Sequence, residues 1–403
     1  MGTEASHGRS ILHIDVNSAY LSWTAVEFLA HGRADDIRRI PSAIAGDPRS
    51  RHGIILAKSE PAKKYGIKTA MTLAEAQRRC PDLALFPPDH AMYKVYSDRM
   101  YALLCEYTDI IERFSIDECW LDYTGSEKIF GPPLEAARAI SARIRKELGF
   151  TVNIGVSTNK LLAKMASERE KPDKIHTLYP GEIAEKMWPL PTDELFGVGH
   201  STKQALARVG LRTIGDVAHA DAVMLRQLLK PVMGQLVHDH ANGIDDTPVL
   251  REELRAEKSI GHSTTTPRDV TDEEEALRYL LSLSERVGLR LRDAGLEAGV
   301  ASVELKNKSF YTYRHQKKLP SRVRTTSEIY EAACAIFREM WRGDDLRLIG
   351  VSLTDLAPAG ARARQISLFE DPEETARGRA IEETQDEIRK KFGRDAIKRG
   401  TLV

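Results

Sequence analysis

Apolar residues along the first half of the chain alternate between the two-residue period of strands and the spacing of helices. Residues 11–17 (ILHIDVN) are predicted to form a short strand, and residues 18–30 carry apolar side chains at helical spacing. The same reasoning predicts strands at 53–57 and 151–156, a strand–turn element at 111–122, and helices at about 72–79, 92–107, 133–148 and 159–168. This order is typical of an antiparallel α+β domain, with residues 35–85 as an insertion.

The second half of the chain follows two other patterns. After residue 180, short helical stretches are separated by glycines as far as Gly243, which predicts a small helical domain. From about 258 to 358 the pattern becomes β-α-β-β-α-β, which predicts a separate domain. Its strands are expected at 259–270, twice within 300–325 and at 346–354, and its helices at 272–292 and 326–341. A charged stretch with one helix over 373–391 follows.

The composition narrows the class of protein. A chain of 403 residues with 42% apolar content can form two to four domains with their own cores. Basic and acidic residues both count 59, so a nucleic-acid surface would need local segregation of charge. The polar N-terminus is unlike a signal peptide, and no stretch approaches the roughly 20 apolar residues that cross a bilayer. We therefore expect a cytoplasmic protein with no membrane contact.

Three acidic residues are spaced as a metal-dependent phosphoryl-transfer site requires. Asp15 ends the first predicted strand, and Asp117 and Glu118 lie in the apolar run 114–122. Two divalent ions about 3.5–4 Å apart, held by carboxylates, stabilise the attacking and leaving oxygens in such sites. Adjacent acids of a strand point to opposite faces, so one would be buried at a cost that a cation relieves. The alternative is a surface turn with two solvated acids, against which the flanking Trp120 argues.

Four motifs in order resemble those of the Y-family translesion DNA polymerases of the DinB/UmuC type. They are Asp15-Val-Asn-Ser-Ala-Tyr20, Ser115-Ile-Asp-Glu118, Gly155-Val-Ser-Thr-Asn-Lys-Leu-Leu-Ala-Lys-Met-Ala-Ser167 and Lys171-Pro172. The resemblance runs from about residue 11 to residue 358 and leaves only the two ends of the chain uncovered, and either half of the motif set alone would be weak.

The resemblance implies a multidomain α+β fold shaped as a right hand. A ferredoxin-like palm would comprise residues 1–34 and 86–178, with small fingers at 35–85. A helical thumb with a helix–hairpin–helix would span 179–247, and a βαββαβ little finger 248–358. Residues 359–403 would form a flexible tail.

The resemblance also implies roles for single residues. Asp15, the Val16 carbonyl, Asp117 and Glu118 would hold two Mg²⁺ ions, for which oxygen ligands are suited. Tyr20 would be the steric gate that excludes a 2′-hydroxyl, unless it is an ordinary core aromatic.

Two lysines complete the expected nucleotide site. Lys164 would contact the triphosphate, unless it is a solvated lysine on the helix surface, and Lys63 stands where the family usually places an arginine. Glu60 replaces a phosphate-contacting tyrosine, and Ala19 replaces an aromatic residue before the gate. These departures put the nucleotide pocket in doubt and leave the metal site untouched.

Contacts to DNA are expected from two regions. Gly197 and Gly199 form a Gly-x-Gly that would let backbone amides approach a phosphate, although such a pair also ends helices in simple turns. Residues 306–324 hold seven cations and no acid, interleaved with aromatic residues, which suits a salt-sensitive grip on phosphates or else a solvated ribbon. The seven are Lys306, Lys308, Arg314, Lys317, Lys318, Arg322 and Arg324.

A short peptide in the tail suggests a protein partner. Gln365-Ile-Ser-Leu-Phe369 resembles the sliding-clamp (β clamp) peptide, in which Gln365, Leu368 and Phe369 would enter a preformed groove. The alternative is a loose hydrophobic pair.

The whole pattern favours a template-directed DNA polymerase of low fidelity. It would use primer-template DNA and dNTPs, perform translesion synthesis without proofreading, and act as a monomer recruited to the clamp. A silent Y-family adaptor would have lost one of the three carboxylates, all of which are present. A nucleotidyl cyclase with a similar palm would need neither the Gly-x-Gly hairpin nor the basic domain.

Overall fold

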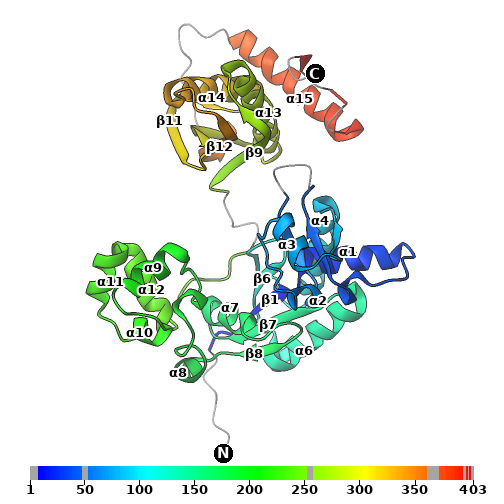
Figure 1. The fold of residues 1–403 in the computed structure, drawn as a ribbon, viewed down its shortest axis with the longest axis vertical. Helices are drawn as coiled ribbons and strands as arrows, with labels where there is room; N and C mark the ends of the chain where they lie inside the picture. The colour runs from blue at the N-terminus through cyan, green and yellow to red at the C-terminus, as the bar shows by residue number, and fades with distance from the viewer. Residues whose placement is uncertain are drawn as a thin grey trace, which may run out of the picture. The chain divides into compact units, whose positions relative to one another are not determined.

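The computed structural model describes residues 8–47, 53–251, 257–360, 372–393, 396–397 and 399–400 of the chain. They belong to two compact units, one within the first 255 residues and one that begins near residue 256 (Figure 1). None of the described helices is long and apolar enough to span a bilayer. Both units mix helices with sheets, so the expected multidomain α+β class is confirmed.

A five-stranded sheet forms the centre of the first unit. Its order is β5-β6-β1-β7-β8, and only the β7–β8 pair is parallel. The strands are β1 (Ile11–Val16), β5 (Ile111–Arg113), β6 (Glu118–Asp122), β7 (Val152–Ser157) and β8 (Ile175–Thr177). Because β1 is central, its side chains are buried on both faces of the sheet.

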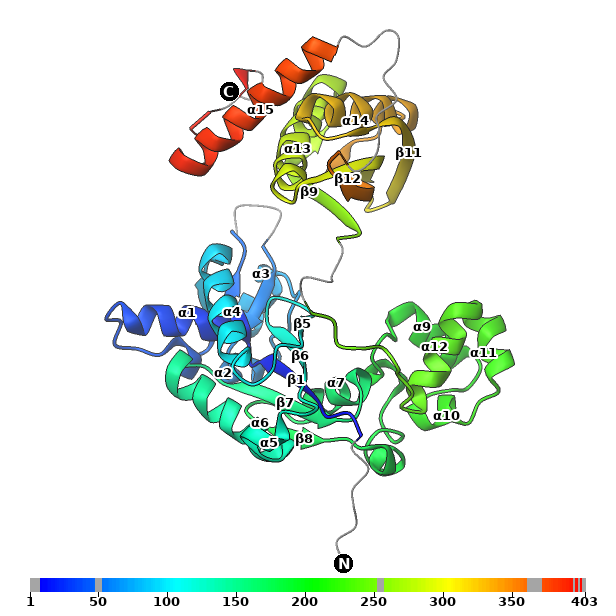
Figure 2. The same ribbon diagram turned by 180° about the vertical axis from the view of Figure 1, so that it is seen from behind.

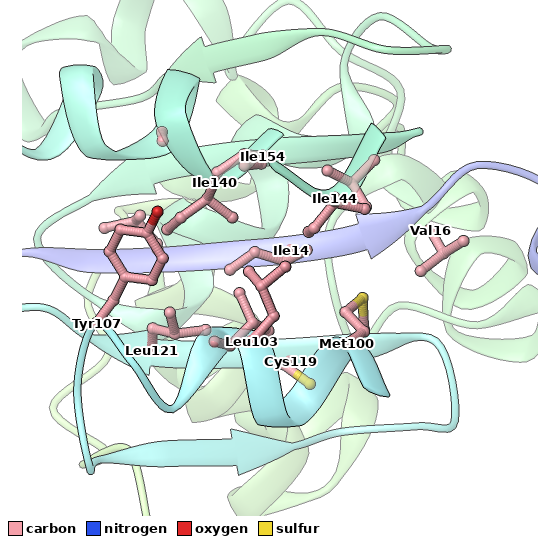
Figure 3. Close-up of a cluster of buried hydrophobic side chains, with 14 of the residues drawn as sticks. Ile14, Val16, Met100, Leu103, Tyr107, Cys119, Leu121, Ile140, Ile144 and Ile154 are labelled. Atoms are coloured by element: carbon pink, nitrogen blue, oxygen red, sulfur yellow. The ribbon is translucent and has the colours of Figure 1, made fainter. Parts of the chain in front are cut away.

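The two faces of β1 have different partners. Leu12, Ile14 and Val16 point into a large apolar core, which Figure 3 shows between the sheet and the helices α4 and α6. That core is covered by α1 (Ala19–Ala30), α4 (His90–Leu104) and α6 (Pro133–Arg143), which continues as a π-helical turn over Ile144–Leu148. His13 and Asp15 alternate to the opposite face, where α7 (Lys160–Glu168) packs on β1 and β7.

A small second sheet lies in the region expected as the insertion. Its order is β3-β2-β4, built from β2 (Ser42–Ala45), β3 (Ile55–Lys58) and β4 (Ala84–Phe86). The 3₁₀ turn η1 (Ile37–Arg39), α2 (Glu60–Lys63) and α3 (Leu73–Arg79) accompany it. A separate cluster of buried residues, including Ala43, Ile55 and Leu73, gives this region its own core.

One short helix, α5 (Glu127–Phe130), lies between β6 and α6. The other short helices come after β8. They are η3 (Pro180–Glu182), α8 (Ile183–Lys186), η4 (Thr192–Glu194), α9 (His200–Arg208), α10 (Ile214–Ala218), α11 (Ala222–Leu229) and α12 (Pro231–Ala241). Their apolar cluster includes Leu161, Leu162 and Met165 of α7. The helix that carries site residues is therefore anchored on both sides.

The second unit is an antiparallel four-stranded sheet with two helices on one face (Figure 2). The sheet order is β11-β10-β12-β9. In sequence the elements are β9 (Ser259–Val270), α13 (Glu273–Asp293), β10 (Leu296–Asn307), β11 (Thr312–Val323), α14 (Thr326–Met340) and β12 (Leu346–Pro358).

The C-terminal helix α15 (Pro372–Phe392) is paired with this unit through charged groups. Arg292 of α13 contacts Glu382 and Asp386, each at 2.6 Å, and all three side chains are at most 8% exposed. Glu382 also accepts hydrogen bonds from the backbone N–H of Thr326 at the start of α14. The helix expected over 373–391 is present as α15, where it pairs with this unit, and the expected clamp peptide at 365–369 lies outside the described residues.

Candidate active site

Three carboxylates meet beside the central sheet. Asp15 of β1 and Glu118 of β6 are direct partners in the antiparallel register, so their side chains lie on the same face. Glu168, the last residue of α7, reaches the same place, and one carboxylate oxygen from each residue lies within 4.8 Å of the others. The sequence predicted two of these acids and missed Glu168.

A close approach of helix to strand delivers Glu168 to the sheet. A Cβ atom on Gly155 of β7 would lie 1.9 Å from the Ala163 carbonyl oxygen and 2.6 Å from the Ser167 nitrogen, so only glycine fits. The side chain of Asn159 accepts a hydrogen bond from the Leu162 N–H and caps the helix at its start. The spacing within α7 then directs Lys164 and Glu168 to one face.

Two lysines neutralise part of this acidic cluster. Lys171 Nζ lies 2.5 Å from Asp15 Oδ2 and 2.8 Å from Glu168 Oε2. Lys164 donates to Glu118 and lies 3.4 Å from Glu168 Oε1. When all three carboxylates are ionised, the two ammonium groups leave one negative charge, and the cluster is then a site for added positive charge.

The pKa values of the two strand acids are shifted in opposite directions. Burial raises the pKa of Asp15 to about 7, although Lys171 counteracts part of the shift. Burial also works against the charged form of Glu118, but the adjacent His13 ring and the Lys164 ammonium group outweigh it and lower its pKa to about 2. The pKa of His13 itself is lowered to about 4, chiefly because the ring is completely buried.

Asp117 lies apart from the three clustered acids. Its backbone carbonyl accepts a hydrogen bond from the Val16 N–H at 3.1 Å, and its side chain accepts one from the Ser115 hydroxyl at 2.6 Å. Burial raises the pKa of its carboxyl group. Asp117 and Val16 both line the cavity next to the cluster. All four residues expected as metal ligands therefore line the same cavity.

That cavity has a volume of about 450 Å³ and two chemically different sides. The four acids and Lys171 line one side, and Ala19 and Tyr20 follow from the start of α1. Lys58, Glu60, Lys63 and Thr69, from the region of the small sheet, line the other. An anionic ligand with an organic ring would find lysines, carboxylates and an aromatic side chain in one space.

Tyr20 is fixed by a sharp turn and by stacking. Ser18 adopts a left-handed backbone with φ 47°, which turns the chain from β1 directly into α1. The Tyr20 ring lies parallel to that of Tyr93, with centroids 4.3 Å apart, and His90 packs edge-on at 5.6 Å.

The basic residues expected at the nucleotide lie in different places. Lys63 pairs with Glu60 at 2.5 Å, and this neutralises the acid that replaces the family's tyrosine. Lys164 is buried against Glu118 and is not among the residues lining the cavity. Lys171 does line the cavity, and its only signal in the sequence is the Lys-Pro motif.

The expected DNA-contact glycines lie at the start of α9. Gly197 has a left-handed φ of 92°, and Gly199 is the N-cap of the helix with no side-chain cap. A Cβ atom at Gly199 would meet no other atom within 4 Å, so the first amides of α9 lie beside open space.

Most of the seven expected cations of the second unit have partners within that unit. Arg314 donates to the Ser302 and Ser352 hydroxyls at 2.8 and 2.6 Å, across three neighbouring strands. Four others pair with acids, and among the described residues Lys306 and Lys318 have no such partner. The four pairs are Lys308–Asp345, Lys317–Glu339, Arg322–Asp355 and Arg324–Glu383.

Comparison with known proteins places this arrangement in a family. The model of the impB/mucB/samB family matches residues 14–168, and that of the family's C-terminal domain matches residues 257–368. DNA polymerase IV of Clostridium acetobutylicum is 46% identical over 98% of both chains. DNA polymerase IV 1 of Bacillus subtilis is 35% identical over 98% of this chain and 93% of its own.

A solved structure shares the fold. The Y-family DNA polymerase chimera Dbh-Dpo4(243-245)-Dbh aligns with a TM-score of 0.73, covering 86% of this chain and 98% of its own, at 23% identity. The alignments with these two DNA polymerase IV chains each cover 98% of this chain. The chain therefore belongs to the impB/mucB/samB family of Y-family polymerases, in its DNA polymerase IV (DinB) branch.

Proposed function

We propose that the chain is a DNA-directed DNA polymerase of low fidelity that performs translesion synthesis by nucleotidyl transfer to a primer. The observation that carries this proposal is the cluster of Asp15, Glu118 and Glu168 on one wall of a cavity that also contains Tyr20. Its membership of the DNA polymerase IV branch supplies the substrate class. A cavity of about 450 Å³ is of the size that holds one small ligand such as a nucleotide.

The donor set of the cluster fits magnesium. All the candidate ligands are hard oxygen donors, and the buried Asp15 carboxyl, whose pKa is about 7, gains from a nearby cation. Asp15, the Val16 carbonyl, Asp117 and Glu118 would hold two Mg²⁺ ions, and Glu168 adds a further carboxylate beside them. When bound, Mg²⁺ stabilises the charge on the phosphate oxygens and on the attacking 3′-oxygen.

The lysines of the cluster have different tasks. Lys171 lines the cavity and pairs with Asp15 and Glu168. Its flexible side chain would let the ammonium group move to contact an anionic ligand in the cavity. Lys164 lies behind Glu118 and orients that carboxylate, which is a positioning role. A direct contact between Lys164 and the triphosphate would require the lysine side chain to turn into the cavity.

The lysines from the region of the small sheet would bind the triphosphate, and Tyr20 would select the sugar. Lys63, together with Lys58, supplies positive charge there, and the Glu60–Lys63 pair reduces repulsion from Glu60. Tyr20, backed by Tyr93, would exclude a 2′-hydroxyl at the sugar.

The remaining modules would hold the DNA. In this proposal, the five-stranded sheet is the palm, the small sheet the fingers, the helices of 179–247 the thumb and residues 248–358 the little finger. The uncapped start of α9, at Gly197 and Gly199, would bind a backbone phosphate. The seven cations of residues 306–324 would track phosphates, and the four that pair with acids would exchange those partners for phosphates, which predicts a strong dependence on salt.

The experiment that tests the proposal is single-nucleotide addition on four primer-templates that differ only in the templating base. We expect each template to direct incorporation of its complementary deoxynucleotide with Mg²⁺ present. A nucleotidyl cyclase would instead convert a free nucleoside triphosphate without DNA, and template-independent conversion of this kind would contradict the proposal.

We also propose that Gln365, Leu368 and Phe369 bind the sliding clamp. Deleting residues 365–369 should abolish stimulation by the clamp and leave basal primer extension intact. Loss of basal activity in that variant would instead assign the segment to the fold.

A further inference from the structure

His13 is completely buried next to the acidic cluster, although the cavity does not include it. It lies on β1 two residues before Asp15 and therefore on the same face of the sheet. Its Nδ1 lies 2.7 Å from the Ser167 hydroxyl, and its Nε2 lies 3.1 Å from Glu118 Oε2. Because the ring does not reach the cavity, any influence on the reaction must act through Glu118.

The protons available to these groups allow two arrangements. A neutral imidazole carries one N–H, and the single hydroxyl proton of Ser167 has two acceptors within reach, His13 Nδ1 and the Lys164 carbonyl at 2.8 Å. If the hydroxyl donates to Nδ1, the ring proton is on Nε2 and faces the Glu118 carboxylate. If the hydroxyl donates to Lys164, the ring proton is on Nδ1, and a lone pair faces that carboxylate.

The second arrangement is unfavourable in a buried site. A nitrogen lone pair 3.1 Å from an ionised carboxylate is repulsive, and burial strengthens that repulsion. Nε2 has no other acceptor within hydrogen-bonding distance among the residues described, and its present contact with Oε2 is poorly aligned. A small rotation of the carboxylate would complete the hydrogen bond. The Nε2–H group therefore favours one orientation of the Glu118 carboxylate.

We propose that Ser167 and His13 are positioning residues, in which the Ser167 hydroxyl holds His13 as its Nε2–H tautomer and the ring orients the Glu118 carboxylate for cation binding. The inference rests on the proposed function, because it assigns Glu118 to the metal site. Glu118 is then held from two sides, by His13 and by Lys164. Outer groups of this kind fix the direction of a ligand's lone pairs.

The tautomer can be read directly by ¹⁵N NMR of the histidine rings in the full chain without DNA or cation. The His13 signal is assigned by its loss in His13→Gln. We expect the Nε2–H tautomer in the parent chain and a shift toward Nδ1–H in Ser167→Ala. Finding Nδ1–H in the parent chain would overturn the proposal.

The consequence for Glu118 is measured by Mn²⁺ affinity without DNA and by steady-state primer extension. Ser167→Ala and His13→Phe should weaken Mn²⁺ binding and lower kcat by about 10- to 100-fold, with the KM for the deoxynucleotide unchanged. His13→Gln should retain more of both, because its amide can donate to Glu118 while accepting from Ser167.

Ser141→Ala is the matched control, since Ser141 is a buried serine on the helix α6. If both serine variants lower only the melting temperature and leave kcat and Mn²⁺ affinity unchanged, His13 is a packing residue and the inference fails. Should His13→Phe not fold, Ser167→Ala alone decides the outcome. The tautomer and the Mn²⁺ affinity are measured without turnover, so they distinguish failure of this inference from failure of the proposed polymerase activity.

Discussion

The carboxylate of Asp15 is costly to keep ionised, because it is mostly buried and lies near Glu118 and Glu168. Its pKa in the folded chain is raised to about 7 from an ordinary value of 3.8. Below pH 3.8 the group is protonated in both states. As the pH rises toward 7 the unfolded chain releases the proton that the folded chain retains, so the free energy of unfolding falls.

Asp15→Asn removes this cost and should therefore stabilise the first unit while abolishing primer extension. Without divalent cations, we expect the melting temperature near pH 7.5 to rise by about 2–4 °C, the shift that about 1 kcal/mol gives in a unit of this size. The gain should shrink toward pH 4. Differential scanning calorimetry across this range checks the sign, and a lower melting temperature at every pH would contradict the raised pKa.

Tyr20 should determine the preference for deoxynucleotides. Tyr20→Ala removes the ring that stacks on Tyr93 at 4.3 Å and opens the cavity under the sugar. We expect ribonucleotide incorporation to rise at least tenfold relative to deoxynucleotide incorporation, which corresponds to about 1.4 kcal/mol of lost discrimination. Tyr20→Phe, which keeps the ring, is the control. Equal selectivity in Tyr20→Ala and the parent chain would leave Tyr20 as a packing residue.

Residues on strands were easier to predict from sequence than those brought in by packing. Asp15 and Glu118 stand out because each is an acid within an apolar strand pattern. Glu168 ends an ordinary helix, and its place depends on how closely α7 approaches β7, which no spacing along the chain reveals. The four-residue spacing between Lys164 and Glu168 on the predicted helix is a signal that could have found it.

At the scale of elements, the contact between α7 and β7 controls the geometry of the acids. In Gly155→Ala the new Cβ would overlap the Ala163 carbonyl and the Ser167 amide, so the helix must move away from the sheet. We expect a loss of about 1–3 kcal/mol in the free energy of unfolding and a large loss of activity as Glu168 is displaced.

Gly181→Ala is the matched control, because its Cβ would meet no other atom within 4 Å. Urea unfolding and primer extension measured on both variants test the argument. Unchanged activity in Gly155→Ala would mean that the helix does not need this close approach.

Long periodic elements were predicted well, and several of the shortest strands were missed. The helices at 272–292 and 326–341 were expected within one residue of α13 and α14. The strands β2, β4 and β8 have only three or four residues each, too few for a period to appear. They exist because neighbouring strands supply their hydrogen bonds, which is tertiary information.

At the scale of the whole molecule, α15 is part of the second unit through a buried charged network. Arg292→Leu would leave Glu382 and Asp386 buried without their main partner. We expect a loss of about 3–5 kcal/mol in the unfolding free energy of that unit. Chemical denaturation of the full chain, followed by the fluorescence change that accompanies unfolding around Trp341, measures it.

Lys390→Ala breaks an exposed pair between the same two helices, with Asp293, and should have little effect. Equal, small effects of the two substitutions would contradict the docking of α15. The sequence alone could not assign a partner to this helix, because its acidic residues could pair with many basic residues of the chain. Only the structure shows that the buried Arg292 is their partner.

The central claim is that the carboxylates beside Tyr20 perform templated nucleotidyl transfer, and primer extension by Asp117→Ala and Glu118→Ala tests it most directly. Glu112→Ala is the control, since Glu112 is a partly buried acid of the neighbouring strand that pairs with Lys160 at 2.7 Å, outside the cluster. We predict that both site variants fold and bind primer-template DNA but lose extension by at least a thousandfold, or about 4 kcal/mol. Glu112→Ala should retain activity. Extension at the parent rate by either site variant would contradict the assignment.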